Sequence, residues 1–114
     1  MNGAVFFLLF FAVSLFAESE GERLFKSNNP AAAIPLLERE LSSGTLSSAA
    51  YNYLGLSYYQ TGQYDKSVAV FEKGLSVPGT DKKVLAYNAG NSAFAAGNYA
   101  KADSCYSLAL SASP

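Results

Sequence analysis

The sequence predicts an all-helical protein built as a stack of antiparallel helix pairs. Three observations support this fold class. Glycines and aromatic residues recur at a constant offset, apolar residues recur at helical spacing, and glycines follow the ends of predicted helices. Half of the 114 residues are hydrophobic and 15% are charged, which is far too apolar for a disordered chain. A chain of this length forms one domain with a modest core.

The repeat has a period close to 35 residues. Five pairs share that offset: Gly55 and Gly90, Gly62 and Gly97, Tyr64 and Tyr99, Phe71 and Tyr106, and Leu75 and Leu110. A weaker first copy lies 34 residues before the second, at Gly21, Ala33, Leu37 and Leu41. The offset predicts three units, approximately residues 14–47, 48–82 and 83–114, with one extra residue in the loop 77–81 of the second unit.

Each unit is predicted to contain two helices joined by a tight turn. The second unit has helices over 49–60 and 64–76, and the third over 84–96 and 99–111. Gly62 and Gly97 stand just past a helix end, where glycine is favoured, and in the first unit an asparagine of the link 27–30 can adopt the turn conformation. Gly55 and Gly90 lie within helices, at a cost of about 1 kcal/mol each relative to Ala. We therefore expect a neighbouring helix to approach closely there.

The N-terminus reads as a targeting segment. Residues 5–16, VFFLLFFAVSLF, are almost entirely apolar. A membrane span needs roughly 20 apolar residues, whereas the core of a signal peptide needs about 7–15. Residues 1–17 are therefore predicted to be a signal peptide cut after Ala17, which places the protein in the periplasm or outside the cell. An uncleaved membrane anchor and a buried first helix of the fold are the alternatives.

These features resemble the tetratricopeptide repeat, whose pattern combines a large residue, Leu-Gly, Tyr, Ala, an aromatic residue and a final Pro. The second unit matches at Tyr51, Leu54, Gly55, Tyr58, Gly62, Tyr64, Phe71 and Leu75, and the third at Gly90, Gly97, Tyr99, Ala102, Tyr106, Ala109, Leu110 and Pro114. The run 87–91 is similar to a bacterial, secreted or membrane-associated version. The resemblance covers residues 18–114 and implies a right-handed superhelical stack of three units. Ser67 and Gly74 replace Ala in the pattern, which is expected to weaken packing.

The resemblance also implies that the first helix of each pair lines a concave groove that binds a peptide or a partner helix. Lys and Arg are missing where some members of the family hold a terminal carboxylate, so a neutral aromatic groove is expected. Tyr59 and Phe94 have an alternative place in the core. By position, the groove residues are Asn52, Leu56, Tyr59, Gln60, Tyr87, Asn91 and Phe94, continued in the first unit by Glu22, Phe25 and Lys26.

The sequence offers little for catalysis. It has no His and a single Cys, Cys105, so the commonest general base and the usual zinc ligands are missing. No phosphate-binding or nucleophile motif is present. We expect no enzyme activity, cofactor or metal. Cys105 is expected to be a buried apolar residue, with a reactive thiol as the alternative.

These observations favour a scaffold or adaptor for protein partners. A net charge of −1 gives no basic face for nucleic acid. The alternatives are a binder of a small hydrophobic ligand and a self-assembling structural subunit. Self-assembly would use an apolar edge expected on the last unit, because stacked repeats end in polar caps and none follows Pro114. Contact with a membrane is expected only through residues 1–17, if they are uncleaved.

Overall fold

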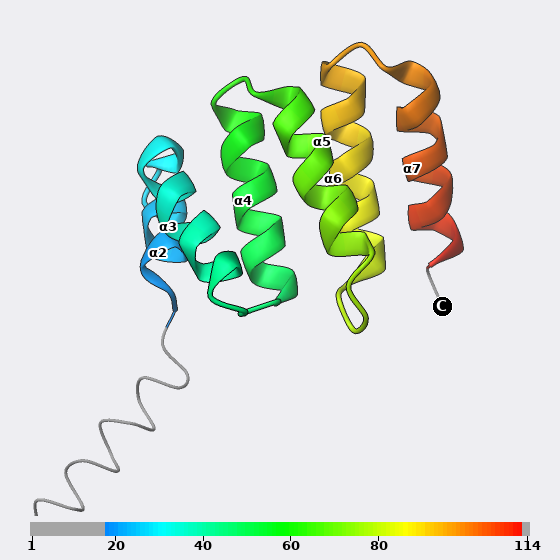
Figure 1. The fold of residues 1–114 in the computed structure, drawn as a ribbon. Coiled ribbons are helices and arrows are strands. Elements are labelled where there is room, and N and C mark those ends of the chain that lie inside the picture. The colour runs from blue at the N-terminus through cyan, green and yellow to red at the C-terminus, as the bar shows by residue number, and fades with distance from the viewer. Residues whose placement is uncertain (1–17, 113–114) are drawn as a thin grey trace, which may run out of the picture.

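The computed structural model describes residues 18–112, and these form a row of α-helices with no strand among them (Figure 1). The helices pair in chain order into three units that stand side by side. The all-helical stack of helix pairs is confirmed. The bounds are α2 (Glu20–Lys26), α3 (Pro30–Ser42), α4 (Ser48–Gln60), α5 (Tyr64–Leu75), α6 (Lys82–Ala95) and α7 (Tyr99–Ser111).

The stack curves toward the first helix of each unit. Each helix packs against the next one along the chain, and the first helices also contact each other across units, α2 with α4 and α4 with α6. Within residues 18–112 the second helices, α3, α5 and α7, do not approach one another in the same way. The exposed faces of α2, α4 and α6 therefore line the concave side, and the second helices spread over the convex side.

Two aromatic rings fill the space left by glycines inside the first helices. Phe71 of α5 is fully buried, and its Cζ would lie 2.4 Å from a Cβ added at Gly55. Tyr106 of α7 has the same relation to Gly90, with ring atoms 2.6 Å from the added Cβ. Because an ordinary side chain cannot occupy that space, the expected close approach at Gly55 and Gly90 is confirmed.

The two departures from the repeat pattern in unit two do not loosen the packing. The Oγ atom of Ser67 donates to the carbonyl of Gly55 at 2.7 Å and lies 2.7 Å from Oγ of Ser92, so its polar atom is satisfied inside the core. Gly74 makes room for the ring of Tyr51, since an added Cβ would lie 2.9 Å from the Tyr51 side chain. The expectation of weakened packing was wrong, because each small residue has a specific neighbour that fills or satisfies its site.

The loop between units two and three is closed by one lysine. The ammonium group of Lys82 donates to the carbonyl of Leu75 at 2.8 Å, to that of Val77, and to Oγ1 of Thr80 at 2.9 Å. Carbonyls at a helix C-terminus have no partner inside the helix, so a cation there is favourable. Lys82 therefore caps α5 and fixes the direction in which α6 begins.

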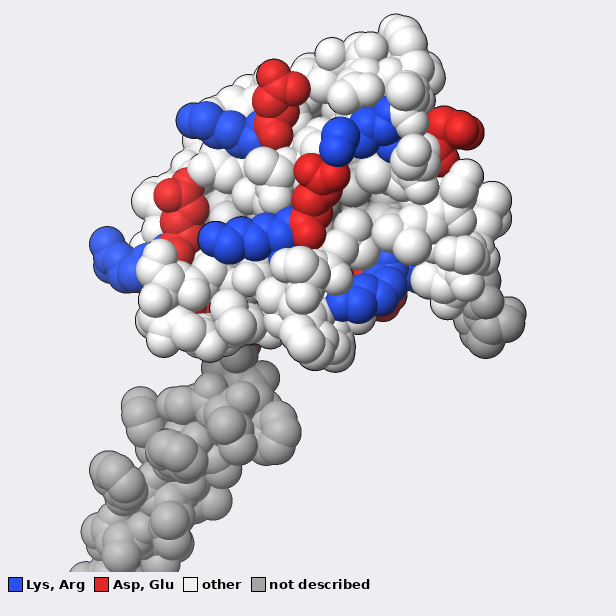
Figure 2. All heavy atoms as spheres, turned by 45° about the vertical axis from the view of Figure 1, so that its right-hand side comes forward, with Lys and Arg blue, Asp and Glu red and all other residues white. Residues whose placement is uncertain are grey.

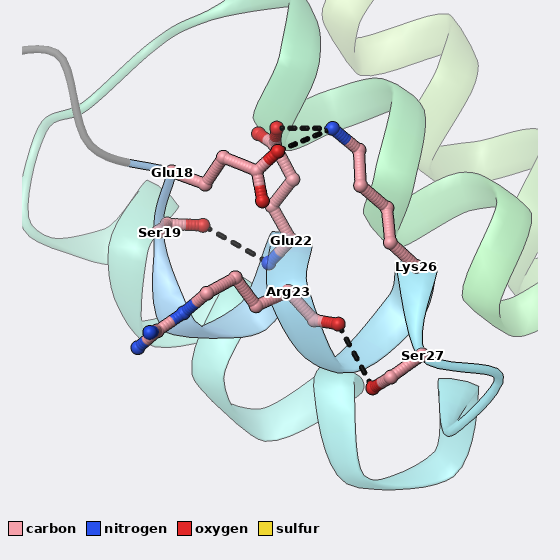
Figure 3. A network of polar contacts seen from close by, with 6 residues as sticks. All are labelled: Glu18, Ser19, Glu22, Arg23, Lys26 and Ser27. Carbon is pink, nitrogen blue, oxygen red and sulfur yellow. Dashed lines mark hydrogen bonds and ion pairs between the residues drawn. The ribbon is translucent and has the colours of Figure 1, made fainter.

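The short helix α2 is fixed by polar contacts at its start (Figure 3). The side chain of Ser19 accepts from the backbone N–H of Glu22 at 3.0 Å and so caps the helix. Lys26 pairs with Glu18 at 2.6 Å and with Glu22 at 3.2 Å. The hydrogen bonds to these two carboxylates raise the pKa of Lys26 above its usual value. These pairs lie at the surface, so they orient α2 but add little to stability.

The predicted signal segment, residues 1–17, lies outside the described residues. Across residues 18–112, none of the helices combines the length and the apolar character that crossing a bilayer requires.

Candidate functional site

The predicted groove residues come from α4 and α6. Tyr87 and Phe94 of α6 are 55% and 59% exposed. Gln60 is also exposed, and Asn52, Tyr59 and Asn91 are half-buried. Phe94 is therefore not a core residue in this structure. Leu56 differs from the rest, because it packs against the core cluster that contains Phe71 and Leu85. We call the surface formed by Asn52, Tyr59, Gln60, Tyr87, Asn88, Asn91 and Phe94 the groove.

Hydrogen bonds fix the asparagines of the groove. Asn88 donates through Nδ2 to Oδ1 of Asn52 at 2.7 Å, which ties α6 to α4. The hydroxyl of Tyr106 donates to Oδ1 of Asn91 at 2.6 Å. Each acceptor is a side-chain amide, which has one oxygen acceptor and two N–H donors. The oxygens of Asn52 and Asn91 are therefore occupied, and within residues 18–112 their N–H groups donate to no protein acceptor.

Two aromatic pairs lie at the end of the groove that contains Gln60 and Phe94. Tyr59 packs edge-on against Tyr64 with ring centroids 5.3 Å apart, and Phe94 packs in the same way against Tyr99 at 5.1 Å. The two pairs stand at equivalent positions, 35 residues apart. Such pairs hold rings in fixed orientations at a gain of about 0.5–1.5 kcal/mol beyond burial. The side chains of Tyr59 and Phe94 therefore have little rotamer freedom.

The groove carries no charged side chain in units two and three. Helix α4 contains no Asp, Glu, Lys or Arg, and α6 contains only Lys82 and Lys83, both in its first turn. Lys82 is held by the preceding loop. Elsewhere on the molecule, Figure 2 shows basic and acidic side chains next to one another, separated by wide uncharged areas. Beyond the first turn of α6, the two helices that form the groove in units two and three are therefore neutral.

The first unit continues the groove with different chemistry. Phe25 packs on Tyr53 with centroids 5.1 Å apart, and the Lys26 ammonium lies 5.7 Å from the same ring. Glu22 is paired with Lys26. The three residues that sequence reasoning placed here are thus brought together, but they contact one another and α4, which leaves less of them open to a ligand.

Sequence reasoning missed the contribution of Tyr106 to the groove. Tyr106 belongs to α7, on the far side of α6, and it was predicted only as the counterpart of the buried Phe71. Its ring crosses α6 over Gly90, packs 5.9 Å from the ring of Tyr87, and brings its hydroxyl to Asn91. The sequence signal was the hydroxyl that Tyr106 carries where unit two has Phe71, because a tyrosine hydroxyl that is partly buried usually has a hydrogen-bond partner.

Cys105 is 7% exposed, as expected for a buried residue, and is one of the residues that line a hollow of about 510 Å³ between α5 and α7. Burial, and then the charge of Glu72, raise the pKa of the Cys105 thiol. A thiol is reactive as the thiolate, so a raised pKa works against reactivity. The hollow lies on the convex side and its rim includes the ion pair of Glu72 with Lys101, 2.7 Å apart.

The described part of the chain shows no group of three or more Cys, Asp or Glu side chains placed to hold a metal ion. Its buried side-chain polar atoms all have partners. No unexplained polar atom in the core of residues 18–112 therefore points to a bound cofactor.

Two comparisons with known proteins bear on this geometry. A family model described as tetratricopeptide repeat matches residues 19–79, and a second model with the same description matches residues 85–114. The first match covers two units and the second covers the third unit. No curated protein matches the chain.

Proposed function

Because the chain belongs to the tetratricopeptide repeat family, whose members generally mediate protein–protein interactions, we propose that it is a scaffold or adaptor that binds a protein partner in the groove. The partner segment is a peptide or a helix without strong charge. The observation that carries this proposal is the pair of exposed rings, Tyr87 and Phe94, on one face of α6 beside asparagines held by hydrogen bonds.

The physical argument rests on how protein interfaces gain affinity. Aromatic residues are enriched at the centres of interfaces because they bury a large area and lose few rotamers. Surface rings that serve no partner are a liability, since exposed apolar patches promote unspecific association. Tyr87 and Phe94 are fixed by neighbouring rings and stand beside unused amide donors. This arrangement supports a preformed binding surface that orders little when a partner arrives.

Replacing Tyr87 and Phe94 together by Ala is expected to weaken partner binding by at least about tenfold, because central aromatic anchors each contribute more than about 1 kcal/mol. A partner captured by cross-linking in the native organism is purified, and its Kd is measured by calorimetry. Helical content is checked by circular dichroism. The control is Leu46→Ala, which removes another exposed apolar side chain, in the loop before α4. Equal affinity of the double variant and the wild type would remove the groove from consideration.

Two alternatives remain beside this proposal. A small hydrophobic ligand needs an enclosed pocket. A hollow of about 260 Å³ lies where α4 and α6 begin, and its lining includes Asn52 and Val84 but neither Tyr87 nor Phe94. Self-association needs an apolar edge, and α7 exposes 78% of Leu110 and 44% of Leu108. The groove is favoured over both because it combines exposed rings with unused donors.

We also propose that the chain is exported and that residues 1–17 are removed. The expected result is that the protein isolated from its native cells begins at Glu18, because the apolar run has the length of a signal-peptide core. Intact-mass spectrometry measures this directly. A mass that includes residues 1–17, together with recovery in the membrane fraction, would instead identify an uncleaved anchor.

A further inference from the structure

Tyr106 reaches the groove from a second helix, α7, and its position has a specific consequence. Its ring lies against Gly90, where a Cβ would be 2.6 Å from the ring atoms. The ring therefore passes α6 through the one place on that helix where no side chain intervenes. The hydroxyl emerges beside Asn91 and donates to its Oδ1 at 2.6 Å.

We propose that Tyr106 is a positioning residue for partner recognition, and this inference rests on the proposed function. By occupying Oδ1, it turns the amide of Asn91 so that its two N–H groups face the groove. Asn88 does the same for Asn52, whose Oδ1 accepts at 2.7 Å. Within residues 18–112, neither of these Nδ2 groups donates to a protein acceptor. The groove thus presents N–H donors from both α4 and α6.

The arrangement specifies the chemistry of the partner. N–H donors need acceptors, and the acceptors with the best match are neutral carbonyl oxygens. A carboxylate is disfavoured, since helix α4 has no Lys or Arg and a charge that loses its water without a counter-ion is costly. Within a helix, the main-chain carbonyls are already paired except in the last turn. The partner segment is therefore extended and uncharged, and its main-chain carbonyls meet Asn52 and Asn91 while its apolar side chains meet Tyr87 and Phe94.

Tyr106 is also held in an environment that keeps it a donor. Partial burial, and then the neighbouring Tyr87 and Tyr59, raise the pKa of Tyr106. A protonated hydroxyl can donate to Oδ1 of Asn91, and the raised pKa extends that protonated form to higher pH. In unit two the equivalent ring, Phe71, has no hydroxyl and is fully buried. Of units two and three, only unit three therefore has a second-helix hydroxyl that reaches a groove asparagine.

The test uses the variant Tyr106→Phe in the full-length chain. The probe is a 12-residue peptide without charged residues, selected on the wild-type protein from a random display library and made with an acetylated N-terminus and an amidated C-terminus. Loss of one orienting hydrogen bond is expected to weaken its binding about 3- to 10-fold. The thermal unfolding midpoint should change little, because Phe fits the equivalent position in unit two.

A double-mutant cycle separates positioning from a merely structural role. If Tyr106 acts through Asn91, Tyr106→Phe has no further effect on binding in an Asn91→Ala background. The matched control is Tyr58→Phe, which removes a hydroxyl that donates to Glu38 rather than to a groove residue and should leave peptide binding unchanged.

The inference is overturned if Tyr106→Phe binds the peptide as the wild type does, or loses the same factor in the Asn91→Ala background. Binding of the free-acid peptide with no binding of the amidated form would also overturn it, because the donors would then serve a carboxylate. If no selected peptide depends on Tyr87 and Phe94, the proposed function fails together with this inference. A peptide that depends on those rings but not on Tyr106 defeats this inference alone.

Discussion

Replacing Phe71 by Ala is expected to lower the free energy of unfolding by about 3–5 kcal/mol, the cost typical of removing a buried phenyl ring. Phe71 of α5 is 0% exposed, and its ring packs against the backbone of α4 at Gly55. The loss combines the transfer of the ring from the core with the cavity that it leaves. Urea unfolding, followed by circular dichroism at 222 nm, measures the change.

The same substitution at Phe94 provides the matched control. Phe94 is 59% exposed and packs mainly on Tyr99. Phe94→Ala is expected to cost less than about 1 kcal/mol, since little apolar area returns to water and one aromatic pair is lost. Equal losses for the two variants would mean that Phe94 belongs to the core, and the groove would then lose one of its two exposed rings.

Replacing Gly55 by Ala is expected to destabilise the chain by about 2 kcal/mol. An added Cβ would meet three ring atoms of Phe71 at 2.4–2.7 Å, closer than real Cβ contacts. Overpacking of this kind costs about 1–3 kcal/mol, and the upper end applies because Phe71 is enclosed. Better helix propensity returns up to about 1 kcal/mol. The measurement is again urea unfolding.

Two further variants test the cause of that loss. Phe71→Leu in the Gly55→Ala background should recover part of the stability that Gly55→Ala loses, because the shorter side chain clears the added methyl group. Gly90→Ala should cost less than Gly55→Ala, because the ring that it meets belongs to the half-buried Tyr106, which has room to move. A Gly55→Ala protein as stable as the wild type would show that the Phe71 ring can move away from the added methyl group without loss of stability.

The fold could be predicted from the sequence because its information is local and repeated. Gly55 with Phe71 and Gly90 with Tyr106 share one spacing, and in units two and three the structure places a ring against the helix glycine at that spacing, whereas unit one has Leu37 against Gly21. In stacked repeats each unit contacts only its neighbours, so no long-range pairing had to be guessed. Helix starts and ends followed from residues with clear conformational preferences, such as Gly62 at a φ of 79° and Gly97 at 83°.

The groove could be predicted only in part. The resemblance to the repeat family assigned Tyr87, Asn91 and Phe94 to the groove by position, and the structure places them on one face of α6. Leu56 was assigned to the groove in the same way, and it is half-buried on α4 and packs against the core cluster. Burial of a side chain at the edge of a helix face depends on how closely the next helix approaches, and sequence spacing does not give that distance.

The sequence by itself determined the repeat, the helix pairs, the glycine contacts and the absence of charge from α4. These depend on residue type and periodicity, which are read along one chain. Only the tertiary structure decided that Lys82 closes the loop before α6, and that the hydroxyl of Tyr106 crosses α6 to orient Asn91. Both depend on the direction of a long side chain between packed helices. The direction of such a side chain is set by the space between its neighbours. For Tyr106 that space exists because Gly90 has no side chain.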